Sequence, residues 1–170
     1  VVLGYYFNNK MLVKDTVLTD ARCVAHFTRD TLYEEGLSLL HFPENGGVFD
    51  ILMPHVQKFT LTCDTMPRQA ERAKVEGSRP LANFIDYQKY ITARQMEYRE
   101  LSREFQAAQG NPARQEEIRR RFVEEDSLVT AHNDQVIAAN KDNFLANFLR
   151  ALKEVKIPQF DIPAGLTDAQ

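Results

Sequence analysis

The sequence predicts an all-α protein, an elongated helical bundle built around a long antiparallel helical hairpin. Apolar residues recur at helical spacing along the second half of the chain, and Gly110-Asn111-Pro112 divides that half into two long helices. Alternation typical of a strand is confined to residues 59–65. A chain of 170 residues with 44% hydrophobic and 26% charged residues has the size and composition of one ordinary globular domain.

One or two N-terminal helices are expected to pack against the hairpin. Residues 10–35 predict the first helix, because apolar residues there step by four, four, three and three positions: Val13, Val17, Ala21, Val24 and Phe27. Gly36 follows at the position of a C-cap glycine. A second helix would begin at Asp50 as its N-cap, with Pro54 in its first turn. A strand over residues 59–65 is the alternative for the end of this segment.

The hairpin is the clearest prediction. Its first helix spans about residues 78–109, with Ser78 as N-cap and Pro80 in the first turn. Its second helix spans about residues 112–155 and is ended by Ile157-Pro158. At about 1.5 Å per residue, the two helices would be roughly 45 and 65 Å long. Such long helices joined by so short a turn predict coiled-coil-like packing.

The N-terminal decapeptide VVLGYYFNNK predicts the end of a membrane segment. Small and apolar residues come first, the aromatic pair Tyr5-Tyr6 follows, and Asn8-Asn9-Lys10 would lie in water. A strand is disfavoured, because the rest of the chain offers it little β pattern to pair with. The chain then divides into residues 1–9, a membrane exit or a soluble arm; 10–156, a single helical domain; and 157–170, an extended tail.

The sequence argues against nucleic-acid binding and contains no catalytic motif. The net charge is −3 and the pI is near 5.8, and Arg120 and Arg121 have glutamates four residues away on either side. No phosphate-binding or dinucleotide-binding glycine motif occurs. No His has a Glu three positions before it, as a di-iron bundle requires. We therefore expect no enzymatic activity, no cofactor and no metal site.

The two cysteines leave two interpretations open. Cys23 and Cys63 would form a disulfide in an oxidising compartment, or they are buried free thiols. Together with His26 and His55 they also make a set of two thiols and two imidazoles. The spacings of that set are wider than those of structural zinc sites, so zinc is not expected.

One group of polar residues interrupts the apolar seam of the hairpin. The seam of the second helix steps by four and three positions through Ile118, Phe122, Glu125, Val129, His132 and Val136. A hairpin folded about Gly110-Asn111 brings residues whose numbers sum to about 222 opposite one another. This register places Arg94 near Glu125, and His132 near Tyr90. Two interpretations remain: an internal polar layer that fixes helix register, or a small-molecule site lined by Tyr87, Tyr90, Arg94, Glu125 and His132.

These observations predict a non-enzymatic, membrane-anchored protein that acts as a structural, assembly or protein-interaction subunit of a larger complex. Protein partners would bind the long hairpin, an anchor would precede Val1, and the oligomeric state stays open. A ligand-binding or sensory bundle is the alternative. Lys10 and Lys14 are balanced by Asp15 and Asp20, so no positive excess marks a cytoplasmic flank. The extracytoplasmic or periplasmic side is therefore preferred to the cytoplasmic one.

Overall fold

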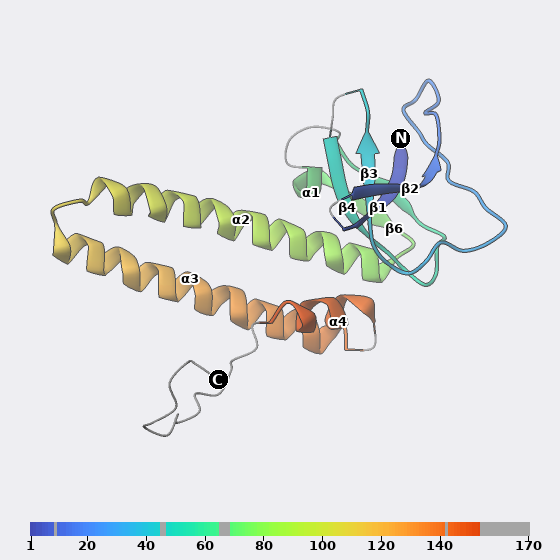
Figure 1. The fold of residues 1–170 in the computed structure, drawn as a ribbon. Coiled ribbons are helices and arrows are strands. Elements are labelled where there is room, and N and C mark those ends of the chain that lie inside the picture. Colours follow the sequence, from blue (N-terminus) through green and yellow to red (C-terminus); the bar gives the residue numbers. More distant parts are fainter. Residues whose placement is uncertain (9, 45–46, 65–68, 142, 154–170) are drawn as a thin grey trace, which may run out of the picture.

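The N-terminal half of the chain forms strands, so the prediction of an all-α bundle is wrong. A computed structural model describes residues 1–8, 10–44, 47–64, 69–141 and 143–153. It is a mixed α/β fold in which a small β-sheet head sits at one end of a long helical arm (Figure 1).

The described residues contain six strands and four helices. One antiparallel sheet has the strand order β2-β1-β3-β4, and β5 and β6 form a separate antiparallel pair. The strands are β1 (Val2–Phe7), β2 (Lys10–Thr16), β3 (Gly36–Phe42), β4 (Gly47–Met53), β5 (Thr60–Thr62) and β6 (Lys74–Glu76). The helices are α1 (Gln69–Arg72), α2 (Arg79–Ala107), α3 (Pro112–Ala139) and α4 (Phe144–Ala151).

Long-range pairing overrides the helical spacing that predicted the two N-terminal helices. Residues 10–16 are β2 and residues 47–53 are β4, which pairs with β3 along its whole length. Residues 17–35 form no helix or strand, and Ala21 and Val24 are exposed there. The apolar steps through 10–35 therefore mark no buried helix face. The strand alternative for residues 59–65 is confirmed in part, because Thr60–Thr62 form β5.

The decapeptide is a sheet strand followed by a turn, which contradicts membrane anchoring through this segment. β1 lies between β2 and β3, and Leu3 is only 1% exposed. Asn8, directly after β1, adopts a left-handed φ of 46°, as is common in the tight turns of β-hairpins. Among the described residues, no helix is long and apolar enough to cross a bilayer.

The helical hairpin is confirmed, and its two N-caps are those that the sequence predicts. α2 and α3 run antiparallel (Figure 1). The side chain of Ser78 accepts a hydrogen bond from the Leu81 N–H, and Asn111 accepts one from the Arg114 N–H. The C-cap of α2 is Ala108 and not the predicted Gly110, which lies in the turn beyond it with a φ of +85° that glycine adopts without strain.

The second helix is shorter than expected. α3 ends at Ala139, and Asn143 caps a separate helix, α4, by accepting from the N–H groups of Leu145 and Ala146. Asn140 is buried and accepts hydrogen bonds from Asn83 and Asn143, so the break is built into the core. Residues 154–155 and the predicted tail over 157–170 lie outside the described residues.

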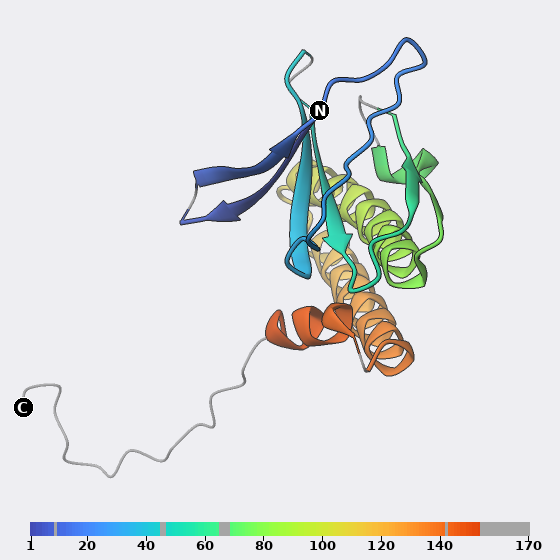
Figure 2. The same cartoon turned by 90° about the vertical axis from the view of Figure 1, so that its right-hand side faces the viewer.

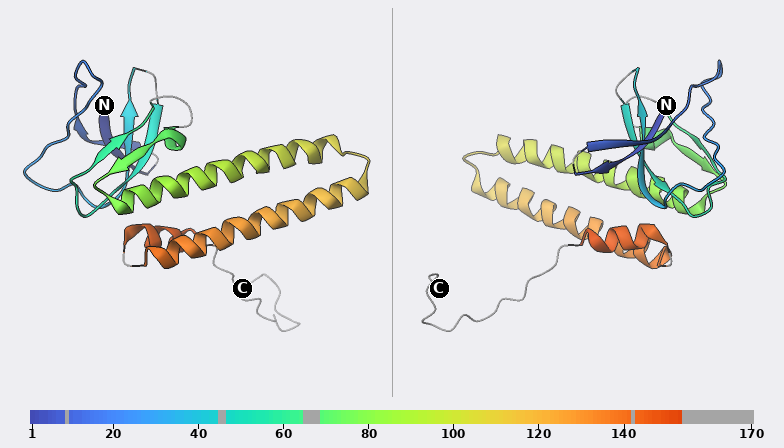
Figure 3. Two further views of the ribbon diagram at one scale, coloured as in Figure 1. Left: turned by 180° about the vertical axis from the view of Figure 1, so that it is seen from behind. Right: turned by 45° about the vertical axis from the view of Figure 1, so that its right-hand side comes forward.

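The core lies where the sheet meets the base of the arm. Ile51 and Leu52 are neighbours in β4 with side chains on opposite faces, and they are 2% and 1% exposed. The sheet is thus covered on both faces at β4, although β4 is an edge strand. Residues of α2 and α4 complete the core: Leu81, Phe84, Ile85, Leu145 and Leu149. Beyond this base the arm projects away from the sheet (Figure 3).

Candidate functional site

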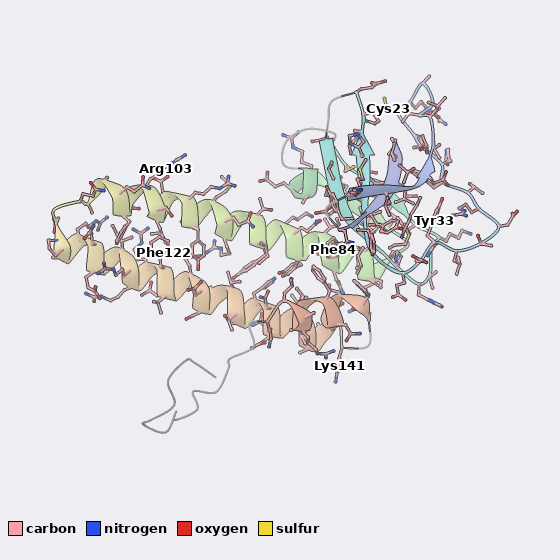
Figure 4. The ribbon with its side chains drawn as sticks, viewed as in Figure 1. Cys23, Tyr33, Phe84, Arg103, Phe122 and Lys141 are labelled. Atoms are coloured by element: carbon pink, nitrogen blue, oxygen red, sulfur yellow. The ribbon has the colours of Figure 1, made fainter. Side chains whose placement is uncertain are left out.

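The five residues predicted for the polar layer lie together along the seam between α2 and α3. Tyr87, Tyr90 and Arg94 come from α2, and Glu125 and His132 come from α3. Side chains fill the space between the two helices, with Phe122 directed from α3 toward α2 (Figure 4). On α2, no residue from 86 to 100 is fully buried, so this part of the seam is aromatic and polar rather than a dry apolar core.

Arg94 and Glu125 form the charged half of this layer. Nη1 of Arg94 donates to both carboxylate oxygens of Glu125, each at 3.1 Å. The two side chains are only 27% and 15% exposed, so the pair is shielded from water more than the other ion pairs of the described residues. The guanidinium also lies 5.7 Å from the ring centroid of Tyr90, within the range of a cation–π contact.

His132 and two tyrosines form the aromatic half. The imidazole stacks on Tyr90, with ring centroids 3.6 Å apart and planes 19° apart, and it lies parallel to Tyr87 at 6.2 Å. Tyr90 Oη donates to the main-chain carbonyl of Leu128 at 3.3 Å, which ties α2 to α3. Burial lowers the pKa of His132, so the neutral imidazole is favoured.

A shallow hollow lies beside the layer and not inside it. It has a volume of about 300 Å³ and is lined by Arg79, Asn83, Asp86, Tyr87, His132, Gln135, Val136, Ala139 and Asn140. Tyr90, Arg94 and Glu125 do not reach it. The structure therefore brings the five predicted residues together, but only two of them face a space that a small molecule could enter.

The cysteines and histidines do not form a metal site among the described residues. Cys23 is exposed and Cys63 is half-buried, and both are free thiols, so the predicted disulfide gains no support. Burial, followed by the charge of Asp64, raises the pKa of Cys63 and disfavours its thiolate. Within the described ranges, no three His, Cys, Asp or Glu side chains are grouped closely enough to hold a metal ion.

Sequence reasoning missed a second candidate site, an apolar ribbon at the N-terminus. β1 pairs with β3 only through Val2–Gly4, whereas it pairs with β2 along its full length. Residues 5–7 and 10–13 therefore leave the sheet as a two-stranded ribbon (Figure 2). We call these residues the ribbon. Its exposed apolar side chains are Tyr6, Phe7, Met11, Leu12 and Val13, of which Tyr6, Phe7 and Val13 are 58–60% exposed.

The base of the ribbon is fixed by Gly4 and Lys14. The strand register shifts between Leu3 and Gly4, and a Cβ on Gly4 would lie 2.6 Å from the Leu12 carbonyl oxygen. Only glycine permits so close an approach of the two main chains. Lys14 Nζ donates to Ser38 Oγ at 3.5 Å and lies 5.0 Å from the Tyr5 ring centroid. The signal in the sequence was the apolar decapeptide itself, which was assigned to a membrane and not to a strand.

No protein family model, no curated protein and no solved structure matches this chain.

Proposed function

We propose that the protein is a non-enzymatic protein-interaction module that binds a partner protein through the ribbon. The observation that carries this proposal is the concentration of five large exposed apolar side chains within eight residues of chain, from Tyr6 to Val13. Single exposed apolar residues are ordinary on protein surfaces, but a contiguous group of them marks a site of association.

The low stability expected of the isolated ribbon also supports a binding partner. A two-stranded hairpin with no third strand and no packed face is marginally stable in water. The ribbon extends past the last β1–β3 pair at Gly4, so its outer residues have only each other as sheet neighbours. A partner that covers the ribbon would remove apolar surface from water and hold the two strands in place.

The composition of the ribbon favours a protein over a nucleic acid as the partner. Lys10 is the only charged residue from Val1 to Val13, so phosphate contacts would be few. Tyr, Phe and Met are the residue types enriched at the buried centres of protein interfaces. Both faces of the ribbon are apolar, since Phe7 and Tyr6 are neighbours on one strand and their side chains point to opposite faces.

The helical hairpin, which the sequence favoured as the contact surface, has weaker support. Its exposed apolar residues are scattered: Met96 on α2, and Val123 and Leu128 on α3. Five residues along a helix turn the chain by about 140°, so Val123 and Leu128 face different directions. The small-molecule alternative is also weaker, because the hollow is open and only Tyr87 and His132 of the polar layer line it.

Photo-crosslinking in the cells that make the protein tests this proposal. A benzophenone amino acid placed at Phe7 should form a discrete covalent adduct with another protein, identifiable by mass spectrometry. The same group at Met96, which is 46% exposed on the arm, is the matched control and should give no such adduct. Adducts at Met96 but not at Phe7 would contradict the proposal.

A further inference from the structure

We infer that the partner binds as an added β-strand along the outer edge of β2, and that it presents an extended, mainly apolar segment with an acidic residue beside Lys10. This inference rests on the proposed function, because it names the geometry and chemistry of the partner at the same ribbon. Strand addition supplies main-chain hydrogen bonds in addition to apolar contact.

The free main-chain groups of β2 can be identified from its register. β2 is the last strand of its sheet, and Phe7 and Lys10 are ladder partners across a two-residue connection. In such a turn the N–H of the fourth residue points to the carbonyl of the first, so the Lys10 main chain faces β1. Facing and outward residues alternate along an antiparallel strand. The N–H and C=O groups of Met11 and Val13 therefore point outward.

Apart from Lys10, the devices that normally protect an edge strand are missing from residues 10–13. Natural edges are guarded by lysines, prolines, bulges or a covering segment. The register shift of β2 lies at the base of the ribbon, next to Gly4, and Lys14 is held against Tyr5 and Ser38. No hydrogen bond from another described segment reaches the main chain of residues 10–13. Lys10 is the only charged residue within residues 10–13.

The side chains of β2 define what an added strand should carry. Lys10 and Leu12 point to one face of the ribbon, and Met11 and Val13 point to the other. An incoming strand would bury apolar residues beside Leu12 on one face and beside Met11 and Val13 on the other. A carboxylate placed beside Lys10 would complete the contact, because opposite charges across strands are stabilising.

Selection from a displayed library of short random peptides tests the inference directly. Peptides that enrich on the folded full chain should alternate apolar residues and carry an Asp or Glu. The best of them, made synthetically, is then the probe. Its binding should slow hydrogen exchange of the Met11 and Val13 amides by about tenfold or more, and leave the Lys10 and Leu12 amides, which already face β1, comparatively unchanged.

Matched substitutions separate edge pairing from simple apolar contact. Val13→Pro and Met11→Pro each remove an outward N–H, and an edge strand tolerates proline at such a position. Each should weaken binding of the probe peptide by about tenfold or more. Val13→Thr and Met11→Thr keep that N–H at the same positions and should weaken it much less. The exchange measurement on the unsubstituted chain decides the question even if a proline variant fails to fold.

The outcomes distinguish this inference from the proposed function. Peptides that bind the ribbon without protecting the Met11 and Val13 amides, or that bind the proline variants equally well, would overturn strand addition while leaving the ribbon as the interaction surface. Failure to enrich any peptide that binds the ribbon would also overturn strand addition. The crosslink at Phe7 reports on the proposed function independently of either result.

Discussion

His132 makes the stability of the arm depend on pH. Its imidazole is stacked on Tyr90, its Nε2 is buried without a hydrogen-bond partner, and burial lowers its pKa. The unfolded chain binds the proton more tightly than the folded chain. The stability that this group contributes is therefore complete above its unfolded pKa, near 6.5, and is lost as the pH falls toward the lower folded pKa.

We expect this loss to appear in urea unfolding curves. The free energy of unfolding should fall between about pH 7 and pH 5, and His132→Phe, which keeps a flat ring but cannot titrate, should reduce that fall. Met96→Phe, which adds a ring at an exposed position of α2 and removes no histidine, is the control and should leave the pH dependence unchanged. Identical slopes for the parent and His132→Phe would show that His132 does not carry the effect.

Tyr33 anchors the irregular segment 17–35 to the sheet. Its Oη donates to Asp15 Oδ2 at 2.5 Å, and its main-chain N–H and C=O bond to the side chain of Gln57. Burial, together with the hydrogen bond to Asp15, raises the pKa of Tyr33 to about 12. The hydrogen bond from Tyr33 is in turn the largest cause that lowers the pKa of Asp15.

Tyr33→Phe should change both titrations. One tyrosine that ionises near pH 12 should disappear from the ultraviolet tyrosinate titration. The signal of Tyr98, whose pKa is also raised to about 12, should remain. The pKa of Asp15, followed by carboxyl-carbon NMR, should rise toward its ordinary value. Tyr6→Phe, at an exposed position, is the control and should leave Asp15 unchanged. An unshifted Asp15 in Tyr33→Phe would contradict this coupling.

We expect the Arg94–Glu125 pair, which joins the two long helices, to fix the register of α2 against α3. Arg94→Leu or Glu125→Leu alone leaves one shielded charge without its partner, and each should lower the free energy of unfolding by about 1–3 kcal/mol. The double substitution should cost less than the sum, because no unpaired charge remains. Additive costs would show that the two groups are not coupled.

The exposed pair Arg103–Glu100 lies on α2, as Arg94 does, and supplies the control for these substitutions. Its side chains are 77% and 59% exposed, so Arg103→Leu should change the free energy of unfolding by well under about 1 kcal/mol. Urea unfolding of these four variants and the parent gives the whole comparison. Equal losses of unfolding free energy in Arg94→Leu and Arg103→Leu would show that shielding from water does not strengthen the Arg94–Glu125 pair.

Elements were predictable where local signals decide the structure. Ser78, Gly110 and Asn111 act on their own neighbours, so the hairpin and the placing of Arg94 beside Glu125 followed from the sequence. The strands did not, because β1 is held in the sheet by β3 partners 35 to 39 residues away, such as Leu40 for Leu3. The ribbon was missed for the same reason: its exposure follows from where β1 parts from β3.

At the scale of the whole molecule, the arm has two regions with different support. Its base shares the core of the head through Leu81, Phe84 and Ile85. Farther out, the fully buried side chains are Leu101 on α2 and Ile118 on α3. Glu104 adds ion pairs with Arg114 at 2.9 Å and with Arg121 at 2.8 Å near the tip. This arrangement predicts that the outer arm opens without unfolding the head.

Leu101→Ala tests this independence. Truncating a buried Leu removes roughly 2–5 kcal/mol of local packing, which exceeds what exposed ion pairs can restore. Hydrogen exchange should therefore accelerate by tenfold or more in the outer turns of α2 and α3, while amides of β3 and β4 keep their protection. Met96→Ala on the exposed side of the same helix is the control and should change neither region. Equal acceleration in β3 and β4 would show that head and arm unfold as one unit. In that case a partner bound at the ribbon would stabilise the arm tip as strongly as the sheet.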